Sequence, residues 1–292
     1  MKKIRFARGP LLQLAGVAAG LAAVAGLAVG GVSAASTRSP MAAHSASGGT
    51  SGTKPTIVLV HGAWANGSSW DGVVQRLQAD GYTVDVPPNP LMGLAFDPAY
   101  IASFLQSISG PIVLVGHSYG GAVITNAATG DKQVKALVYV DAFAPDQGQT
   151  IGGLVSSVPG SCVVAADPTT IFNLAAYPGA PAGAFDAYYK QNLFPACFAN
   201  GLPLKQARNL AATAEPLSTV ALSQPSGVPA WKTIPSWAVV GTADHVIPPA
   251  LQLAMAKHAH AHITEVRAPH LSMIAAPGVV TRVILRAVHA TG

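Results

Sequence analysis

Runs of consecutive apolar residues are the clearest pattern along this chain of 292 residues. Four of these runs cover residues 57–60, 112–115, 136–140 and 237–240, and the stretch 263–266 predicts one more strand. Apolar residues that follow one another without alternation are typical of strands covered on both faces. The pattern therefore predicts an α/β fold, with a mostly parallel sheet that helices cover on both faces.

The first 34 residues show a different pattern. Basic residues between positions 2 and 8 precede an apolar stretch at 11–32, and Val32-Ser33-Ala34 fits the small-x-small rule for a cleavage site. This order is typical of a signal peptide for export to the periplasm or the cell exterior. An uncleaved leader would instead anchor the chain, because the apolar stretch is long enough to span a membrane. We expect a signal peptide at 1–34, a flexible linker at 35–54 and one folded domain at 55–292.

Composition fits a folded domain with a large core. Half of the residues are hydrophobic and 10% are charged, which argues against disorder. The formal net charge is +5, and the leader contributes four of these charges because it holds four basic and no acidic residues. The rest of the chain is nearly neutral and has no basic cluster with interleaved aromatics. We therefore expect no nucleic-acid partner and, once the leader is cleaved, no stable membrane partner.

One short motif adds chemistry to this picture. Residues 116–120 read Gly-His-Ser-Tyr-Gly, directly after the apolar run at 112–115 and before a helix-compatible stretch at 122–129. An abrupt turn from strand to helix strains the backbone at its apex, and small residues on either side let the chain segments pass. The hydroxyl of Ser118 is then held at the carboxyl edge of the sheet. We predict that Ser118 is a nucleophile; the alternative is a Gly-rich turn without chemistry.

Two later loops carry the partners that a serine nucleophile needs. Serine requires a general base, and the base requires an acid that orients it. His270 follows the predicted strand at 263–266, and Asp244 follows the run at 237–240. We predict His270 as the base and Asp244 as the acid. Asp141, which directly follows the run at 136–140, is the second choice for the acid.

Backbone donors for a developing oxyanion are also present. His61-Gly62-Ala63-Trp64 follows the first predicted strand, and the glycine lets the backbone turn so that the Ala63 N–H can face the site. The N–H of Tyr119, which follows Ser118, points in the same direction. We predict Ala63 and Tyr119 as the donors of the oxyanion hole.

Together these stretches resemble the α/β-hydrolase superfamily over about residues 55–290. The closest branch has an H-G-A-W oxyanion loop and contains plant methyl esterases, hydroxynitrile lyases and many bacterial esterases. The resemblance implies that Ser118, Asp244 and His270 form a catalytic triad beside the donors Ala63 and Tyr119. It also implies hydrolysis of small or medium carboxylic esters through an acyl-enzyme, with no cofactor. The matching stretches are residues 61–70, 113–128, 136–145, 231–249 and 266–273.

In this fold, the insertion at about 143–232 is expected to form a helical cap over the site. We expect helices near residues 169–176, 182–191 and 203–214. Three candidates for substrate binding are Trp64, Phe172 and Tyr188. Trp64 either lines the cleft or packs the oxyanion loop. The cap aromatics line a pocket or anchor the cap to the core, and they are Phe172, Phe185, Tyr188, Tyr189, Phe194 and Phe198.

The remaining chemistry-bearing residues are few. Cys162 and Cys197 lie in the same insertion, and an even cysteine count in an exported chain predicts a disulfide, with two reduced thiols as the alternative. Asp97-Pro98 is typical of a helix N-cap followed by proline at the first helical position. We expect no metal site. The alternating histidines at 258, 260 and 262 lie where a helix ends and a strand begins, so one geometry is not expected to hold for all three.

Three other functions fit the same residues. A hydroxynitrile lyase would need a cationic lysine near the triad, and neither Lys190, Lys205 nor Lys232 stands at an obvious position for it. A perhydrolase would use the same triad. A ligand-binding protein would carry a silent triad. We predict an esterase, and the presence of all triad residues and both donors argues against a silent triad. The expected partner is therefore a small-molecule ester; the oligomeric state is not readable from the sequence.

Overall fold

The computed structural model describes residues 53–292. The predicted signal peptide at 1–34, and the linker at 35–54 apart from its last two residues, lie outside the described residues. Within residues 53–292, no helix is both long and apolar enough to cross a membrane.

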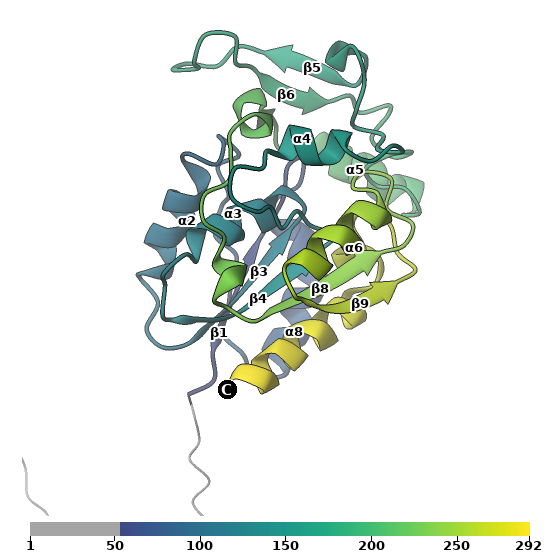
Figure 1. Cartoon of the computed structure of the whole chain (residues 1–292). Coiled ribbons are helices and arrows are strands. Elements are labelled where there is room, and N and C mark those ends of the chain that lie inside the picture. The colour runs from purple at the N-terminus through teal and green to yellow at the C-terminus, as the bar shows by residue number, and fades with distance from the viewer. Residues whose placement is uncertain (1–52) are drawn as a thin grey trace, which may run out of the picture. The chain divides into compact units, whose positions relative to one another are not determined.

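A six-stranded parallel sheet forms the centre of the fold, in the order β2-β1-β3-β4-β8-β9 (Figure 1). The four continuous apolar runs are the four central strands, as predicted, and nearly all of their residues are buried. The stretch at 263–266 falls in an edge strand. The strands are β1 (Thr56–Val60), β2 (Val84–Asp85), β3 (Ile112–His117), β4 (Val134–Val140), β8 (Ser236–Gly241) and β9 (His262–Val266).

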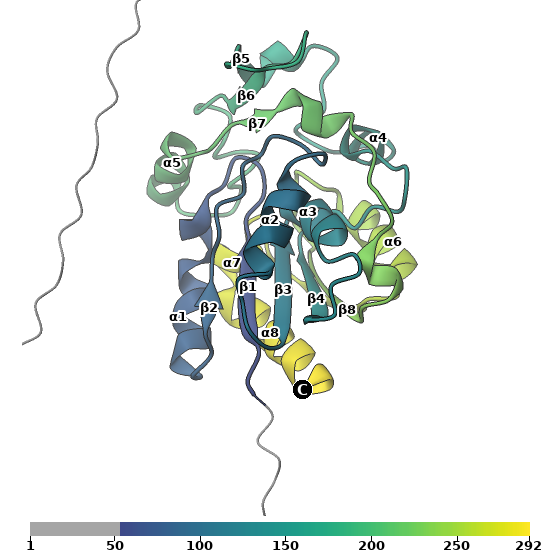
Figure 2. The same cartoon turned by 90° about the vertical axis from the view of Figure 1, so that its left-hand side faces the viewer.

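Helices cover both faces of this sheet (Figures 1 and 2). On one face α1 (Asp71–Ala79) packs against α8 (Pro277–Thr291), and on the other α2 (Asp97–Leu105) packs against α3 (Tyr119–Ala127). A further helix, α6 (Pro249–His258), contacts β8 and β9, and the short α7 (Ser272–Ala275) precedes α8. This layered arrangement confirms the predicted fold class.

The chain between β4 and β8 forms a cap beyond the carboxyl ends of the central strands (Figure 1). Three of its segments pair as an antiparallel sheet in the order β5-β6-β7, and two helices flank them. The cap elements are α4 (Ile151–Ser156), β5 (Phe172–Ala175), β6 (Asp186–Tyr189), α5 (Leu204–Ala212) and β7 (Leu217–Ser218).

The predicted helices near 169–176 and 182–191 are wrong, because these stretches hold the strands β5 and β6. Residues 176–185 between them are rich in proline, glycine and alanine and form the connection of a hairpin. In β6 the buried residues Ala187 and Tyr189 alternate with more exposed neighbours, which is the period of a strand. The helix expected near 203–214 is present as α5, so the cap is mixed and not purely helical.

Candidate active site

Ser118 lies at the apex of the turn between β3 and α3. Its backbone has φ 52° and ψ −123°, an uncommon conformation for a residue with a side chain. The flanking glycines make the turn possible. A Cβ on Gly116 would lie 2.6 Å from the Gly120 carbonyl oxygen, and a Cβ on Gly120 would lie 2.6 Å from the Val60 carbonyl oxygen. The spacing of the motif therefore follows from backbone segments in direct contact.

Three side chains from separate loops form a hydrogen-bonded chain at this turn. The Ser118 hydroxyl lies 3.0 Å from Nε2 of His270, and Nδ1 of His270 lies 2.7 Å from Oδ2 of Asp244. His270 is fully buried and Ser118 is 4% exposed. The structure thus brings together the three residues that the sequence predicts as a triad.

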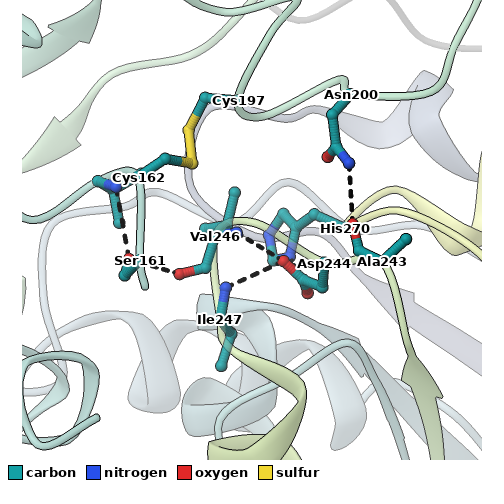
Figure 3. The surroundings of a disulfide bond; sticks show 10 residues. Ser161, Cys162, Cys197, Asn200, Ala243, Asp244, Val246, Ile247 and His270 are labelled. Atoms are coloured by element: carbon teal, nitrogen blue, oxygen red, sulfur yellow. Dashed lines mark hydrogen bonds and ion pairs between the residues drawn. A yellow bond between two sulfur atoms is a disulfide. The ribbon is translucent and has the colours of Figure 1, made fainter. Parts of the chain in front are cut away.

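The Asp244 carboxylate is held from several directions (Figure 3). Its Oδ1 accepts the backbone N–H groups of Val246, at 2.7 Å, and Ile247, at 3.0 Å. Its Oδ2 accepts the amide N–H of Gln252 on α6 at 2.7 Å, in addition to the bond with His270. These donors fix the carboxylate, so that it can fix the orientation of the imidazole.

Burial shifts the pKa values of His270 and Asp244. It lowers the pKa of His270, which keeps the imidazole neutral and able to accept the serine proton. Burial also raises the pKa of Asp244, while the backbone N–H groups of Ile247 and Val246 oppose that shift by stabilising the carboxylate. A neutral base next to an acid held by N–H donors is the arrangement that general-base chemistry requires.

Asp141, the second choice for the acid, has a different position. Its Oδ1 accepts the N–H of Gly241 at 2.8 Å and its Oδ2 accepts the N–H of Ser272 at 3.0 Å. It therefore ties the loop that carries Asp244 to the loop that carries His270. Burial and the nearby charge of Asp244 raise the pKa of Asp141. The histidine is bonded to Asp244, which agrees with the first choice.

The two predicted oxyanion donors belong to segments that touch. A Cβ on Gly62 would lie 2.6 Å from Cβ of Ser118. The loop after β1 therefore passes directly against the turn between β3 and α3 at Ser118, which we call the elbow. Among the described residues, neither the N–H of Ala63 nor that of Tyr119 has an acceptor. The N–H of Tyr119 is also the first of helix α3, whose dipole favours negative charge. Both groups are therefore available to an oxyanion.

Trp64 joins the oxyanion loop to the cap. Its indole stacks on Phe172, with ring centroids 4.9 Å apart, and donates its N–H to the carbonyl of Ala187 at 2.8 Å. The edge of its ring meets Phe198, whose ring in turn lies 5.0 Å from that of His270. A line of aromatic rings thus connects the oxyanion loop and the cap to His270.

An apolar cavity of about 460 Å³ lies beside Trp64, within the cap. Two of the predicted substrate-binding residues, Trp64 and Phe172, line it, together with Phe185. The third, Tyr188, is not in its lining and is 43% exposed on the outer face of β6. Tyr189, Phe194 and Phe198 are buried and pack against one another in edge-on or tilted contacts, as expected of residues that anchor the cap. The cavity is also lined by Val155, Val163, Ala165, Leu174, Ala187, Leu217 and Leu222.

Three further histidines make structural contacts. His117 is fully buried and its Nε2 bonds the backbone carbonyl of His270 at 3.0 Å, which supports the loop of the predicted base. His61 accepts the N–H of Asn89 at 3.2 Å. Nε2 of His258 lies 2.9 Å from Oδ2 of Asp146. Within residues 53–292, no group of three or more His, Cys, Asp or Glu side chains could hold a metal ion.

Asp97 supports the site in a way that the sequence did not reveal. The predicted N-cap is instead the first residue of α2, and its buried carboxylate accepts the N–H groups of Met92, at 2.9 Å, and Gly93, at 3.0 Å. It also accepts the hydroxyl of Tyr119 at 2.8 Å. This bond ties the residue after Ser118 to α2. The only feature of the sequence that pointed to this hydrogen bond is the tyrosine directly after Ser118.

The sequence model of the alpha/beta hydrolase family matches residues 57–283. The chain therefore belongs to the alpha/beta hydrolase family, which confirms the resemblance of its motifs.

Two curated relatives and one solved structure illustrate the similarity. The chain is 32% identical over 114 residues to the carbendazim hydrolyzing esterase of Nocardioides sp. (strain SG-4G), covering 34% of this chain and 46% of that esterase. It is 29% identical over 263 residues to the alpha/beta hydrolase nvfD of Aspergillus novofumigatus (strain IBT 16806), covering 80% of this chain and 96% of the relative. The match thus spans about half the length of the esterase and nearly all of nvfD.

The fold is also similar to the crystal structure of a pyrethroid hydrolase from Sphingobium faniae JZ-2. The TM-score is 0.62 at 22% identity, over 81% of this chain and 98% of that one. At this identity the similarity concerns the fold.

The close contact of Gly120 with the backbone of Val60 and His61 can be tested by a Gly120→Ala substitution. The new Cβ would lie 2.6 Å and 2.7 Å from the carbonyl oxygens of Val60 and His61, which are backbone atoms that cannot rotate away. We expect a loss of about 1–3 kcal/mol in the free energy of unfolding, measured by urea denaturation. The control is Gly278→Ala in α8, where the nearest atom is an Arg282 nitrogen at 3.7 Å. Equal stability of the two variants would contradict the packing of the elbow.

Proposed function

We propose that this protein is a serine hydrolase that cleaves small or medium carboxylic esters through an acyl-enzyme. The observation that carries this proposal is the buried series of hydrogen bonds from Ser118 through His270 to Asp244, next to two backbone N–H groups that have no acceptor within residues 53–292. Membership of the alpha/beta hydrolase family and the similarity to an esterase support it.

The proposed reaction begins when His270 takes the proton of the Ser118 hydroxyl. The serine oxygen bonds to the ester carbonyl carbon, and the carbonyl π electrons move to its oxygen, where the N–H groups of Ala63 and Tyr119 stabilise the negative charge. Asp244 holds the imidazolium that forms. The C–O bond to the alcohol then breaks, and His270 gives its proton to the leaving oxygen.

Water completes the proposed cycle. His270, neutral again, accepts a proton from a water molecule as the water oxygen attacks the acyl-enzyme carbonyl. The same two N–H groups hold the second oxyanion. Collapse of this intermediate breaks the bond to Ser118, whose oxygen recovers the proton from His270. The products are the carboxylic acid and the free enzyme.

The cap cavity supports an uncharged, apolar group on the substrate. Its volume of about 460 Å³ falls within the usual range of ligand pockets, and none of the described residues that line it carries a charge. Trp64 belongs both to this lining and to the oxyanion loop, next to Ala63. We infer that the apolar part of the ester occupies the cavity while its carbonyl lies at Ser118.

Hydrolysis is favoured over the hydroxynitrile-lyase alternative by the positions of two cap lysines. A lyase of this kind needs a cation at the leaving group. The ammonium of Lys190 donates to the carbonyl of Thr169 at 2.6 Å, and that of Lys232 pairs with Asp146 at 2.8 Å. Both ammonium groups thus already have partners, and the third lysine, Lys205, is exposed on α5.

We also propose that the protein is exported by its N-terminal leader. A disulfide joins Cys162 and Cys197 in the structure, with Cα atoms 5.9 Å apart. Disulfides persist mainly in oxidising compartments, which supports export.

Substitution of the proposed nucleophile or base tests the reaction. We expect Ser118→Ala and His270→Ala each to lower kcat for p-nitrophenyl butyrate by about 10⁴- to 10⁶-fold, because each removes a member of one catalytic unit. The controls are Ser223→Ala and His289→Ala, at exposed positions, which should keep wild-type rates. Full activity of Ser118→Ala or of His270→Ala would rule out the proposed chemistry.

The pH dependence of kcat/KM tests the protonation state of His270. Only the neutral imidazole can accept the serine proton, so activity falls as the pH drops through the pKa of His270. Because burial lowers that pKa from the ordinary value of 6.5, we expect the midpoint of the acid limb below pH 6.5. The measurement uses an ester whose own charge is constant. A midpoint above pH 6.5 would contradict a buried, neutral base.

A substitution in the cavity tests where the apolar group binds. Val155 of α4 is buried and lines the cavity, so Val155→Phe would fill part of it. We expect kcat/KM to fall about tenfold for p-nitrophenyl octanoate and less than about twofold for the acetate. The control is Val228→Phe at a position that is 52% exposed. The same loss for both esters would place the apolar group elsewhere.

A further inference from the structure

Two segments of the cap bond the loop that carries Asp244. On one side, the Ser161 hydroxyl donates to the carbonyl of Val246 at 2.6 Å, and the N–H of Cys162 donates to the carbonyl of His245 at 2.8 Å. On the other side, the amide N–H of Asn200 donates to the carbonyl of Ala243 at 2.8 Å. The cap therefore binds carbonyl groups on both sides of Asp244.

The disulfide connects these two segments. Cys162 follows Ser161 directly, and Cys197 lies three positions before Asn200, so the bond between the cysteines joins the two sets of donors. Figure 3 shows the disulfide between the segment of Ser161, whose hydroxyl bonds Val246, and the segment of Asn200, whose amide bonds Ala243. The cysteines are 35 positions apart, and the chain between them forms the hairpin of β5 and β6. Closing so long a segment removes much of the freedom of its ends.

The loop itself is held between the cap and the carboxylate. Its carbonyl groups bond the cap, while its N–H groups at Val246 and Ile247 bond the carboxylate of Asp244. A shift of the cap donors would thus turn the same peptide groups that orient the carboxylate. The carboxylate in turn orients His270, whose Nδ1 lies 2.7 Å away.

We propose that Ser161, Cys162, Cys197 and Asn200 form a disulfide clamp that positions Asp244 for catalysis. The proposal rests on the proposed function, because positioning matters only if Asp244 orients a general base. The clamp residues act through the loop and are positioning residues. Their loss should therefore lower kcat more than it raises KM.

The first test removes the donors and leaves the disulfide intact. We expect Ser161→Ala and Asn200→Ala each to lower kcat for p-nitrophenyl butyrate by about three- to tenfold, the range expected for one hydrogen bond, with KM changed less than about twofold. The matched controls are Ser223→Ala and Asn209→Ala, exposed cap residues outside the clamp, with rates like wild type. Wild-type kcat in both clamp variants would overturn the proposal.

The second test opens the disulfide. A dithiol reductant transfers two electrons and two protons to the sulfur–sulfur bond, which yields two thiols on the protein and oxidises the reductant to a cyclic disulfide. We expect kcat to fall about tenfold or more, and to recover on re-oxidation. The Cys162→Ser/Cys197→Ser double variant should match the reduced protein. Circular dichroism verifies that the fold is retained, and unchanged kcat in folded, reduced protein would overturn the clamp.

The third test separates positioning of Asp244 from a general effect of the cap. In an Asp244→Asn background the clamp has no carboxylate to position, so adding Ser161→Ala should cause no further loss of kcat. A further loss as large as in wild type would mean that the clamp acts through another part of the site. That result would overturn the proposal.

Hydrogen exchange, which does not depend on catalysis, distinguishes the clamp proposal from the proposed function. The amides of Val246 and Ile247, which donate to Asp244, should exchange hydrogen about tenfold faster when Ser161→Ala or reduction removes the clamp. Unchanged exchange would overturn the clamp whatever the activity. If instead exchange accelerates while the wild-type protein hydrolyses no ester, the proposed function fails and the clamp is a structural restraint on the loop only.

Discussion

The hydrogen bond between His270 and Asp244 is the interaction on which the site depends. Both side chains are buried, and a buried carboxylate without donors would be strongly destabilised. The loop after β8 supplies two of its donors and Gln252 on α6 supplies another. The conformation of that loop, the position of α6 and the charge state of the imidazole are therefore linked through one carboxylate.

The topology of the sheet explains how residues so far apart in the sequence meet. Ser118 follows β3, Asp244 lies in the loop after β8, and His270 lies in the loop after β9; all three strands are parallel and end at the same edge. Between β3 and β8 lies β4. Asp141, directly after β4, accepts the N–H of Gly241 at the end of β8 and the N–H of Ser272, two positions after His270. Parallel strands thus fix the three positions, and buried hydrogen bonds fix their orientations.

Much of this arrangement could be predicted from the sequence because its determinants are local. The central strands follow from continuous apolar runs, and the elbow follows from glycines spaced around Ser118. The cap could not be predicted in the same way. Its hairpin is stabilised by pairing between β5 and β6 and by contact with Trp64, which are tertiary effects that outweigh the local resemblance to helices.

The contacts that support the candidate site could not be predicted from the sequence for a related reason. Ser161 and Asn200 bond carbonyl groups of a loop about 85 and 43 positions away, and a carbonyl group carries no residue-specific signal. The role of Asp97 depends in the same way on the distant hydroxyl of Tyr119. Such contacts become visible only when the fold has placed the segments side by side.

The most direct test of the central claim is to label the protein with a fluorophosphonate, which reacts with activated serines, and to locate the label by peptide mass spectrometry. The account predicts one label per chain, on Ser118, and a reaction rate that nearly vanishes in His270→Ala. No label on folded protein, or a label on a different serine, would contradict an activated Ser118.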